Sequence, residues 1–70
     1  MTPNSWFLLL RLSDYTQASI IKGVLEENLI QVLLLNKQDS SYLNFGEVEL
    51  YVPVHLKDIA SHVLDKGLSN

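Results

Sequence analysis

The sequence predicts a small two-layer α+β sandwich with the element order βαββα. Three observations support this prediction: an apolar run near the start, a cleanly alternating segment in the middle, and two segments whose apolar residues recur at helical spacing. A helix with one apolar stripe needs a surface to cover, and two such helices can cover the same face of a three-stranded sheet. The other face of that sheet is then expected to stay open.

The strands are predicted from apolar runs and from alternation. Residues 6–12 are apolar except for Arg11, which is typical of a strand partly covered on both faces. Residues 30–35 form a second apolar run, predicted as the second strand. Residues 47–52 alternate, and the apolar residues at the even positions are expected to face the helices. Pro53 should end this third strand because proline cannot donate to a ladder.

The first helix is predicted from its capping residues and its apolar stripe. Asp14 and Gln17 have the spacing of a capping box, so a helix should begin at about Tyr15, and Asn28 is expected to end it. Its sheet-facing residues are expected to be Ala18, Ile21, Val24, Leu25 and Leu29. Gly23 falls on the outer surface, where it is either a tolerated glycine or a point of close approach for another backbone.

The second helix is predicted from a stripe near the C-terminus. Its apolar members are Leu56, Ile59, Ala60, Val63 and Leu64. His55, Asp58 and His62 project from another side at a spacing compatible with metal ligands. Because Asp65 and Lys66 share that side, we interpret it as a solvated face and predict no metal site and no cofactor.

The topology follows from these elements. A right-handed crossover from the first strand to the second, with the third inserted between them, gives the order 1-3-2 with antiparallel neighbours and two helices on one face. This is a ferredoxin-like arrangement that lacks the fourth strand, in a single domain over residues 1–70. On the open face, the expected cross-strand pairs are Arg11 with Glu47, Leu9 with Glu49 and Phe7 with Tyr51.

Composition excludes several classes of function. The net charge is −3 and the five basic residues are scattered, so nucleic acids and acidic membranes are not expected partners. The chain has no cysteine, which excludes thiol catalysis and thiolate metal sites. The apolar run at the start is far shorter than the roughly 20 residues of a membrane span, so we expect a cytoplasmic protein. A chain of 70 residues has a small core, which favours a partner subunit.

Several features together resemble one protein family. They are the capped helix with Ala18, Lys22, Gly23 and Leu25, the polar segment from Asn36 to Tyr42, and the strand exit with Val48, Leu50, Val52 and Pro53. With this pattern the chain resembles the small prokaryotic signal-transducing proteins, a bacterial family of unknown biochemical function. The resemblance implies a ferredoxin-like domain and a role in signal transduction, and it supplies no catalytic residue.

The loop over residues 36–46 is the densest cluster of reactive groups. Its candidate ligand-binding or partner-binding residues are Lys37, Asp39, Ser40, Ser41 and Tyr42. In one interpretation these groups bind a small anion. In the other, the loop is a long hairpin connection in which Asp39 and the serines cap backbone groups. Catalysis by a serine would need a nearby base, and the histidines lie on a different predicted element.

From these observations we expect a non-enzymatic regulatory or protein-interaction module. The alternative is a small-ligand or anion sensor that uses the loop over residues 36–46. The expected partner is another protein or a second copy in a homodimer, bound by the edge of the first strand or by an apolar patch on the open face. The residues of that interface are predicted to be Phe7, Leu9, Leu33, Leu35 and Tyr51. In a competing interpretation, the N-terminal residues or the tail after Gly67 cover this surface within one chain.

Overall fold

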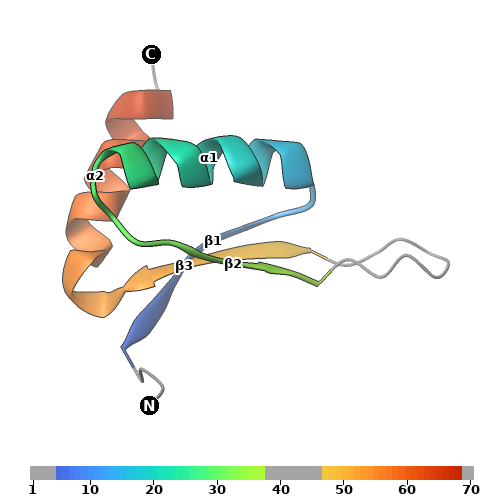
Figure 1. Cartoon of the computed structure of the whole chain (residues 1–70), viewed down its shortest axis with the longest axis horizontal. Helices are drawn as coiled ribbons and strands as arrows, with labels where there is room; N and C mark the ends of the chain where they lie inside the picture. Colours follow the sequence, from blue (N-terminus) through green and yellow to red (C-terminus); the bar gives the residue numbers. More distant parts are fainter. Residues whose placement is uncertain (1–4, 38–46, 69–70) are drawn as a thin grey trace, which may run out of the picture.

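The computed structural model describes residues 5–37 and 47–68, and Figure 1 shows their arrangement. The elements in chain order are β1 (Trp6–Leu12), α1 (Tyr15–Glu27), β2 (Leu33–Asn36), β3 (Val48–Pro53), a short 3-10 turn (Val54–Leu56) and α2 (Lys57–Leu68). The three strands form one sheet in the order β1-β3-β2, and both neighbouring pairs are antiparallel. The predicted fold class, βαββα with no fourth strand in the described chain, is confirmed.

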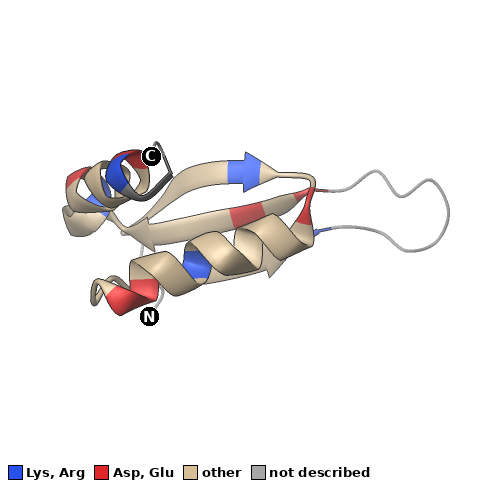
Figure 2. Ribbon diagram, turned by 90° about the horizontal axis from the view of Figure 1, so that it is seen from above, with Lys and Arg blue, Asp and Glu red and all other residues tan. Residues whose placement is uncertain are grey.

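One face of the sheet packs against both helices. Val48, Leu50 and Val52 of β3 are fully buried and share one cluster with helix residues. The helix members of that cluster are Ala18, Ile21 and Leu25 of α1 and Ala60 of α2. Helix α1 packs on all three strands, whereas α2 packs on β1 and β3. The core therefore lies between one helical layer and one face of the sheet, and no described element covers the opposite face (Figures 1 and 2).

Helix α1 begins where its capping residue predicts. The Asp14 Oδ1 atom accepts hydrogen bonds from the backbone N–H groups of Thr16 at 3.0 Å and Gln17 at 3.4 Å. These bonds satisfy two amides that the first turn of the helix leaves without a carbonyl partner. The predicted start at Tyr15 is confirmed.

Helix α1 ends in a Schellman motif with an unusual residue. The N–H of Leu29 donates to the carbonyl of Glu26 at 3.0 Å, and the N–H of Ile30 donates to that of Leu25 at 3.1 Å. This geometry requires a left-handed residue at position 29, where glycine is usual, and Leu29 has φ 64°. The sharp reversal leaves the Leu29 side chain 91% exposed. The prediction that Leu29 faces the sheet is therefore wrong, and Ile30 is the buried residue instead.

Strand β1 contains a β-bulge that was not predicted from the sequence. Between Leu8, opposite Tyr51, and Leu10, opposite Leu50, the register shifts and Leu9 is the extra residue. After the bulge, Arg11 lies opposite Glu49 rather than the predicted Glu47. The other predicted partners, Glu49 for Leu9 and Tyr51 for Phe7, are also wrong, because the bulge changes which face each side chain occupies.

Strand β3 spans Val48–Pro53 rather than residues 47–52, so Pro53 is its last residue. One further boundary and one buried face also differ from the predictions. Strand β2 spans Leu33–Asn36 rather than residues 30–35, since the Schellman turn occupies the first positions of the apolar run. On α2, Ile59 is 52% exposed although it belongs to the predicted apolar stripe, and Ala60 beside it is fully buried. The helix thus contacts the core over a narrower face than the stripe indicated.

Candidate functional site

The open face of the sheet carries the clearest concentration of interacting side chains. In an antiparallel ladder, directly opposed residues share a face, so Glu49 and Tyr51 of β3 define which neighbours lie on this side. By this rule the open face contains Trp6, Leu8 and Arg11 of β1, Leu33 and Leu35 of β2, and Glu49, Tyr51 and Pro53 of β3. It divides into an apolar part and a charged part.

The apolar part lies around Tyr51. Leu8 and Leu33 flank this ring on the two neighbouring strands, and Leu35 lies one pleat further along β2. All four side chains keep some exposure, and Leu33 is 37% exposed. We call Leu8, Leu33, Leu35 and Tyr51 the open-face apolar patch.

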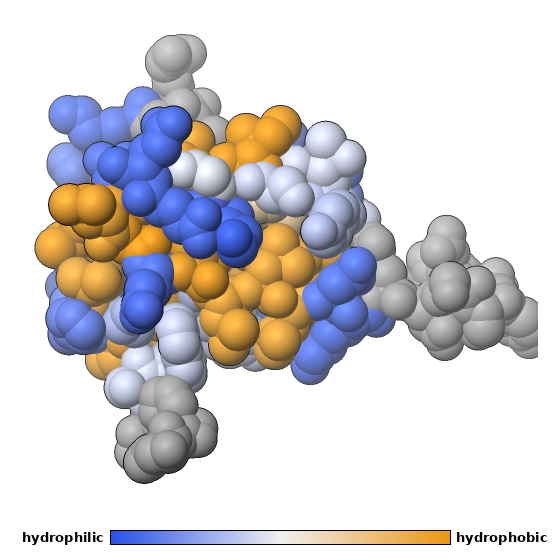
Figure 3. Space-filling view, in the orientation of Figure 1, coloured by the Kyte–Doolittle hydropathy of each residue, from blue (hydrophilic) through white to orange (hydrophobic). Residues whose placement is uncertain are grey.

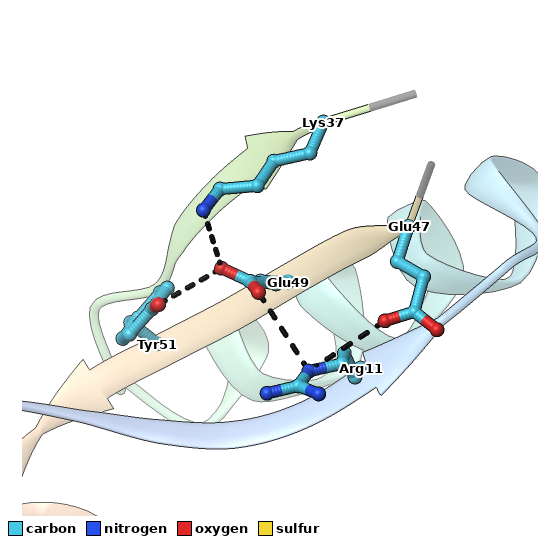
Figure 4. Close-up of polar contacts among 5 residues, drawn as sticks. All are labelled: Arg11, Lys37, Glu47, Glu49 and Tyr51. Carbon is cyan, nitrogen blue, oxygen red and sulfur yellow. Dashed lines mark hydrogen bonds and ion pairs between the residues drawn. The ribbon is translucent and has the colours of Figure 1, made fainter. Parts of the chain in front are cut away.

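The charged part is organised by Glu49 (Figure 4). Its Oε1 atom accepts a hydrogen bond from the Tyr51 hydroxyl at 2.9 Å and lies 3.4 Å from the Lys37 Nζ atom. The other oxygen, Oε2, lies 3.6 Å from Arg11 Nε, and the same nitrogen is 3.6 Å from Glu47 Oε1. Only 12% of the Glu49 side chain is exposed, whereas its cationic neighbours are largely solvated. We call these five residues the Glu49 cluster.

The pKa shifts in this cluster follow from its contacts. The Tyr51 hydroxyl bond, with Lys37 and Arg11 nearby, lowers the pKa of the Glu49 carboxyl against an opposing contribution from its burial. The same bond and the negative charge beside it raise the pKa of Tyr51. At neutral pH Glu49 is therefore ionised and Tyr51 is protonated. Each shift moves the pKa of its group further from neutrality, the range that suits a general acid or base.

The predicted interface residues are only partly brought together. Leu33, Leu35 and Tyr51 lie on the open face, as predicted. Placing Phe7 and Leu9 there is wrong. Phe7 lies opposite the buried Val52 on the helix-covered face, where Lys57 Nζ sits 5.8 Å from its ring centroid, and Leu9 packs against the core.

Leu8 occupies the open face in place of Phe7 and Leu9, and no sequence signal identified it, because the unbroken leucine run fits either register. Of the Glu49 cluster, only the pairing of Arg11 with Glu47 was predicted; this ion pair is present although the two residues are not directly opposite, and the contacts of Glu49 were missed. The signal for the cluster was the placement of Glu47, Glu49 and Tyr51 on one side of an alternating strand.

The predicted loop site falls mostly outside the described residues. Asp39, Ser40, Ser41 and Tyr42 belong to residues 38–46, so of the five candidate residues only Lys37 is described. Its backbone N–H donates to the Glu47 carbonyl at 2.9 Å, and its ammonium group pairs with Glu49. Lys37 thus belongs to the Glu49 cluster.

A groove between the two helices is a separate, concave feature of the surface. It has a volume of about 340 Å³ and is lined by Val24 and Asn28 of α1 and by His62, Val63 and Lys66 of α2. In the described residues His62 belongs to no cluster of three groups able to hold a metal ion. The groove is shallow and mixed in polarity, so its geometry does not specify a ligand.

Comparisons with protein-family models, with curated proteins and with solved structures gave no match. The resemblance to the small prokaryotic signal-transducing proteins therefore stays a prediction. Neither helix in the described part of the chain has the length and hydropathy of a membrane span.

Proposed function

We propose that this chain is a non-enzymatic protein-interaction module, with a regulatory role in line with the family it resembles, and that it binds its partner through the open face of the sheet. The observation that carries this proposal is the open-face apolar patch next to a charge-neutral Glu49 cluster. Exposed apolar areas rimmed by polar groups commonly mark interaction sites on soluble domains.

The balance of charge supports this choice of surface. The open face carries Arg11 and Lys37 against Glu47 and Glu49, so its formal charges cancel, while the chain as a whole has net charge −3. Figure 2 shows that both helices carry further acidic residues, which lie away from the open face. A partner that approaches the open face meets no net repulsion, and charged groups of either sign can find a counterpart at its rim.

The chemistry of the cluster supports binding over catalysis. The Glu49 oxygens are engaged by Tyr51, Lys37 and Arg11, and the shifts move the pKa values of Glu49 and Tyr51 further from the neutral range that suits a general acid or base. These contacts also fix the side chains in one arrangement before a partner arrives. A preorganised face loses less side-chain entropy on binding than a mobile one.

The alternative function is the small-ligand or anion sensor that uses residues 36–46. For this role Lys37 would have to leave Glu49 or share its charge with the ligand. Titration with inorganic phosphate separates the two proposals. If the chain is a sensor, the chemical shifts of the Lys37 and Ser40 backbone amides should change and saturate as phosphate is added. If it is an interaction module, no saturable change is expected at these amides.

The interaction surface is tested by matched polar substitutions. Leu33→Gln changes the open-face apolar patch, and Ile20→Gln changes a comparably exposed residue of α1, which is 54% exposed. Tagged versions of the wild type and of both variants are used to capture interacting proteins from the cells of origin. We expect Leu33→Gln to lose the captured partner and Ile20→Gln to retain it. Retention by both variants, or loss only with Ile20→Gln, would contradict the proposed surface.

A further inference from the structure

The two edges of the sheet differ in how well they are protected. Strand β1 carries the Leu9 bulge and the charged Arg11, two features that hinder pairing with another strand. Strand β2 has neither, since its residues Leu33–Asn36 include no charge, no proline and no register shift. Among the described elements only β3 pairs with it. Strand β2 is therefore the edge that lacks protection.

The ladder shows which backbone groups of β2 face outward. The Lys37 N–H donates to the Glu47 carbonyl of the segment leading into β3. Because backbone groups alternate in direction along a strand, those of Leu35 and Leu33 also point to β3. The N–H and C=O of Leu34 then point away from the sheet. Figure 3, seen from the side on which β2 forms the sheet edge, shows apolar side chains gathered below α1 along this edge.

The flank of α1 above this edge carries charges of both signs. Lys22 Nζ lies 2.9 Å from Glu26 Oε2. These residues are about 160° around the helix axis from Val24, which lines the groove with α2. Since α2 packs on β1 and β3, the flank opposite that groove faces the β2 edge.

We propose that a second copy of this chain pairs with the first along β2, antiparallel and about a two-fold axis. The result is a continuous six-stranded sheet in the order β1-β3-β2-β2-β3-β1. An antiparallel pair of identical strands is self-complementary, which is the condition for a closed two-fold interface. The two α1 helices then run antiparallel across the seam, so Lys22 of each copy approaches Glu26 of the other.

This pairing also enlarges the surface of the proposed function. Leu33 and Leu35 lie on β2, next to the axis, so the open-face apolar patches of the two copies meet across the seam. The dimer thereby presents one apolar area about twice as large as either chain alone. The β2 pairing does not depend on the open face binding a partner, and the two proposals can fail separately.

Backbone methylation tests the pairing directly. A chain of 70 residues is accessible to chemical synthesis, and N-methyl-leucine at position 34 removes the outward N–H while it keeps the side chain. The matched control is N-methyl-leucine at position 8. Leu8 lies opposite Tyr51, and the backbone groups of Tyr51 point to β2. The backbone N–H and C=O of Leu8 therefore point away from the sheet, at the β1 edge. Far-UV circular dichroism establishes that both chains fold, and sedimentation equilibrium gives their masses.

We expect the wild type and the control at position 8 to sediment at about twice the chain mass of 7.9 kDa at tens of micromolar, and the chain methylated at position 34 to sediment as a monomer. A wild type that is monomeric at hundreds of micromolar, or a chain methylated at position 34 that still dimerises, overturns the proposal.

Charge variants provide an independent test if methylation prevents folding. Lys22→Glu should weaken the dimer by roughly fivefold or more at low salt, because it sets like charges against each other across the seam. The double variant Lys22→Glu with Glu26→Lys should restore the dimer. Equal dissociation constants for all three chains would contradict the arrangement of the α1 helices.

Discussion

The replacement of Leu29 by glycine should stabilise the protein although it removes an apolar side chain. Leu29 occupies the position after the cap of α1 with φ 64°, a conformation that costs a residue with a Cβ atom roughly 1–2 kcal/mol. Glycine adopts this conformation without that cost. The side chain is 91% exposed, so almost no buried area is lost with it.

The expected gain is smaller than the relieved strain. Glycine also makes the unfolded chain more flexible, which destabilises the folded state by about 0.4–1 kcal/mol. At the middle of these two ranges, the difference leaves a net stabilisation of about 0.5–1 kcal/mol. In a domain of this size, 1 kcal/mol shifts the melting temperature by roughly 4–8 °C, so Leu29→Gly should raise it by roughly 2–8 °C.

Thermal and urea unfolding followed by circular dichroism measure this gain. Leu29→Ala is the matched control, because it removes the same exposed side chain but keeps a Cβ atom at the left-handed position. We expect the control to melt near the wild-type temperature. If Leu29→Gly melted at or below the temperature of Leu29→Ala, the left-handed backbone at this helix end would carry no strain, which contradicts the prediction.

Three further predictions concern the helix and the open face. Gly23→Ala should stabilise by about 1 kcal/mol in urea unfolding, because a Cβ atom there meets nothing within 4 Å, and a loss would reveal a contact that the folded chain needs. Asp14→Ala should cost about 1 kcal/mol by the same assay, and no change would mean that its two bonds do not cap the helix. Because the pKa of Glu49 is lowered on folding, its contribution to stability is present above its ordinary pKa of 4.5 and lost as pH falls through the folded value. The urea midpoint of wild type should therefore fall more steeply on acidification than that of Glu49→Gln, whereas parallel curves would contradict the assigned shift.

Local signals in the sequence predicted the elements better than their pairing. The Asp14 cap and the alternation in β3 each depend on neighbours within a few residues, and both predictions hold. The register of β1 does not depend on local signals. When the run of leucines in β1 shifts by one residue against β3, each face of the sheet keeps nearly the same apolar content. The bulge at Leu9 was therefore not predictable from composition.

The candidate site was predictable to a similar degree. Leu33, Leu35 and Tyr51 were placed on the open face because alternation fixes the face of a strand once one buried position is known. Phe7 and Leu9 were misplaced because they precede or form the bulge. The bond between Glu49 and Tyr51, which joins residues two apart on one face, follows from the alternation and required no tertiary information.

Site-specific photocrosslinking tests the central claim, binding through the open face, most directly. A photoreactive amino acid is placed at Leu33 on the open face or at Ile20 on α1, and the cells of origin are irradiated. We expect position 33 to yield discrete protein adducts that position 20 does not yield. Adducts from position 20 alone, or none from position 33, would contradict the claim that the open face is the binding surface.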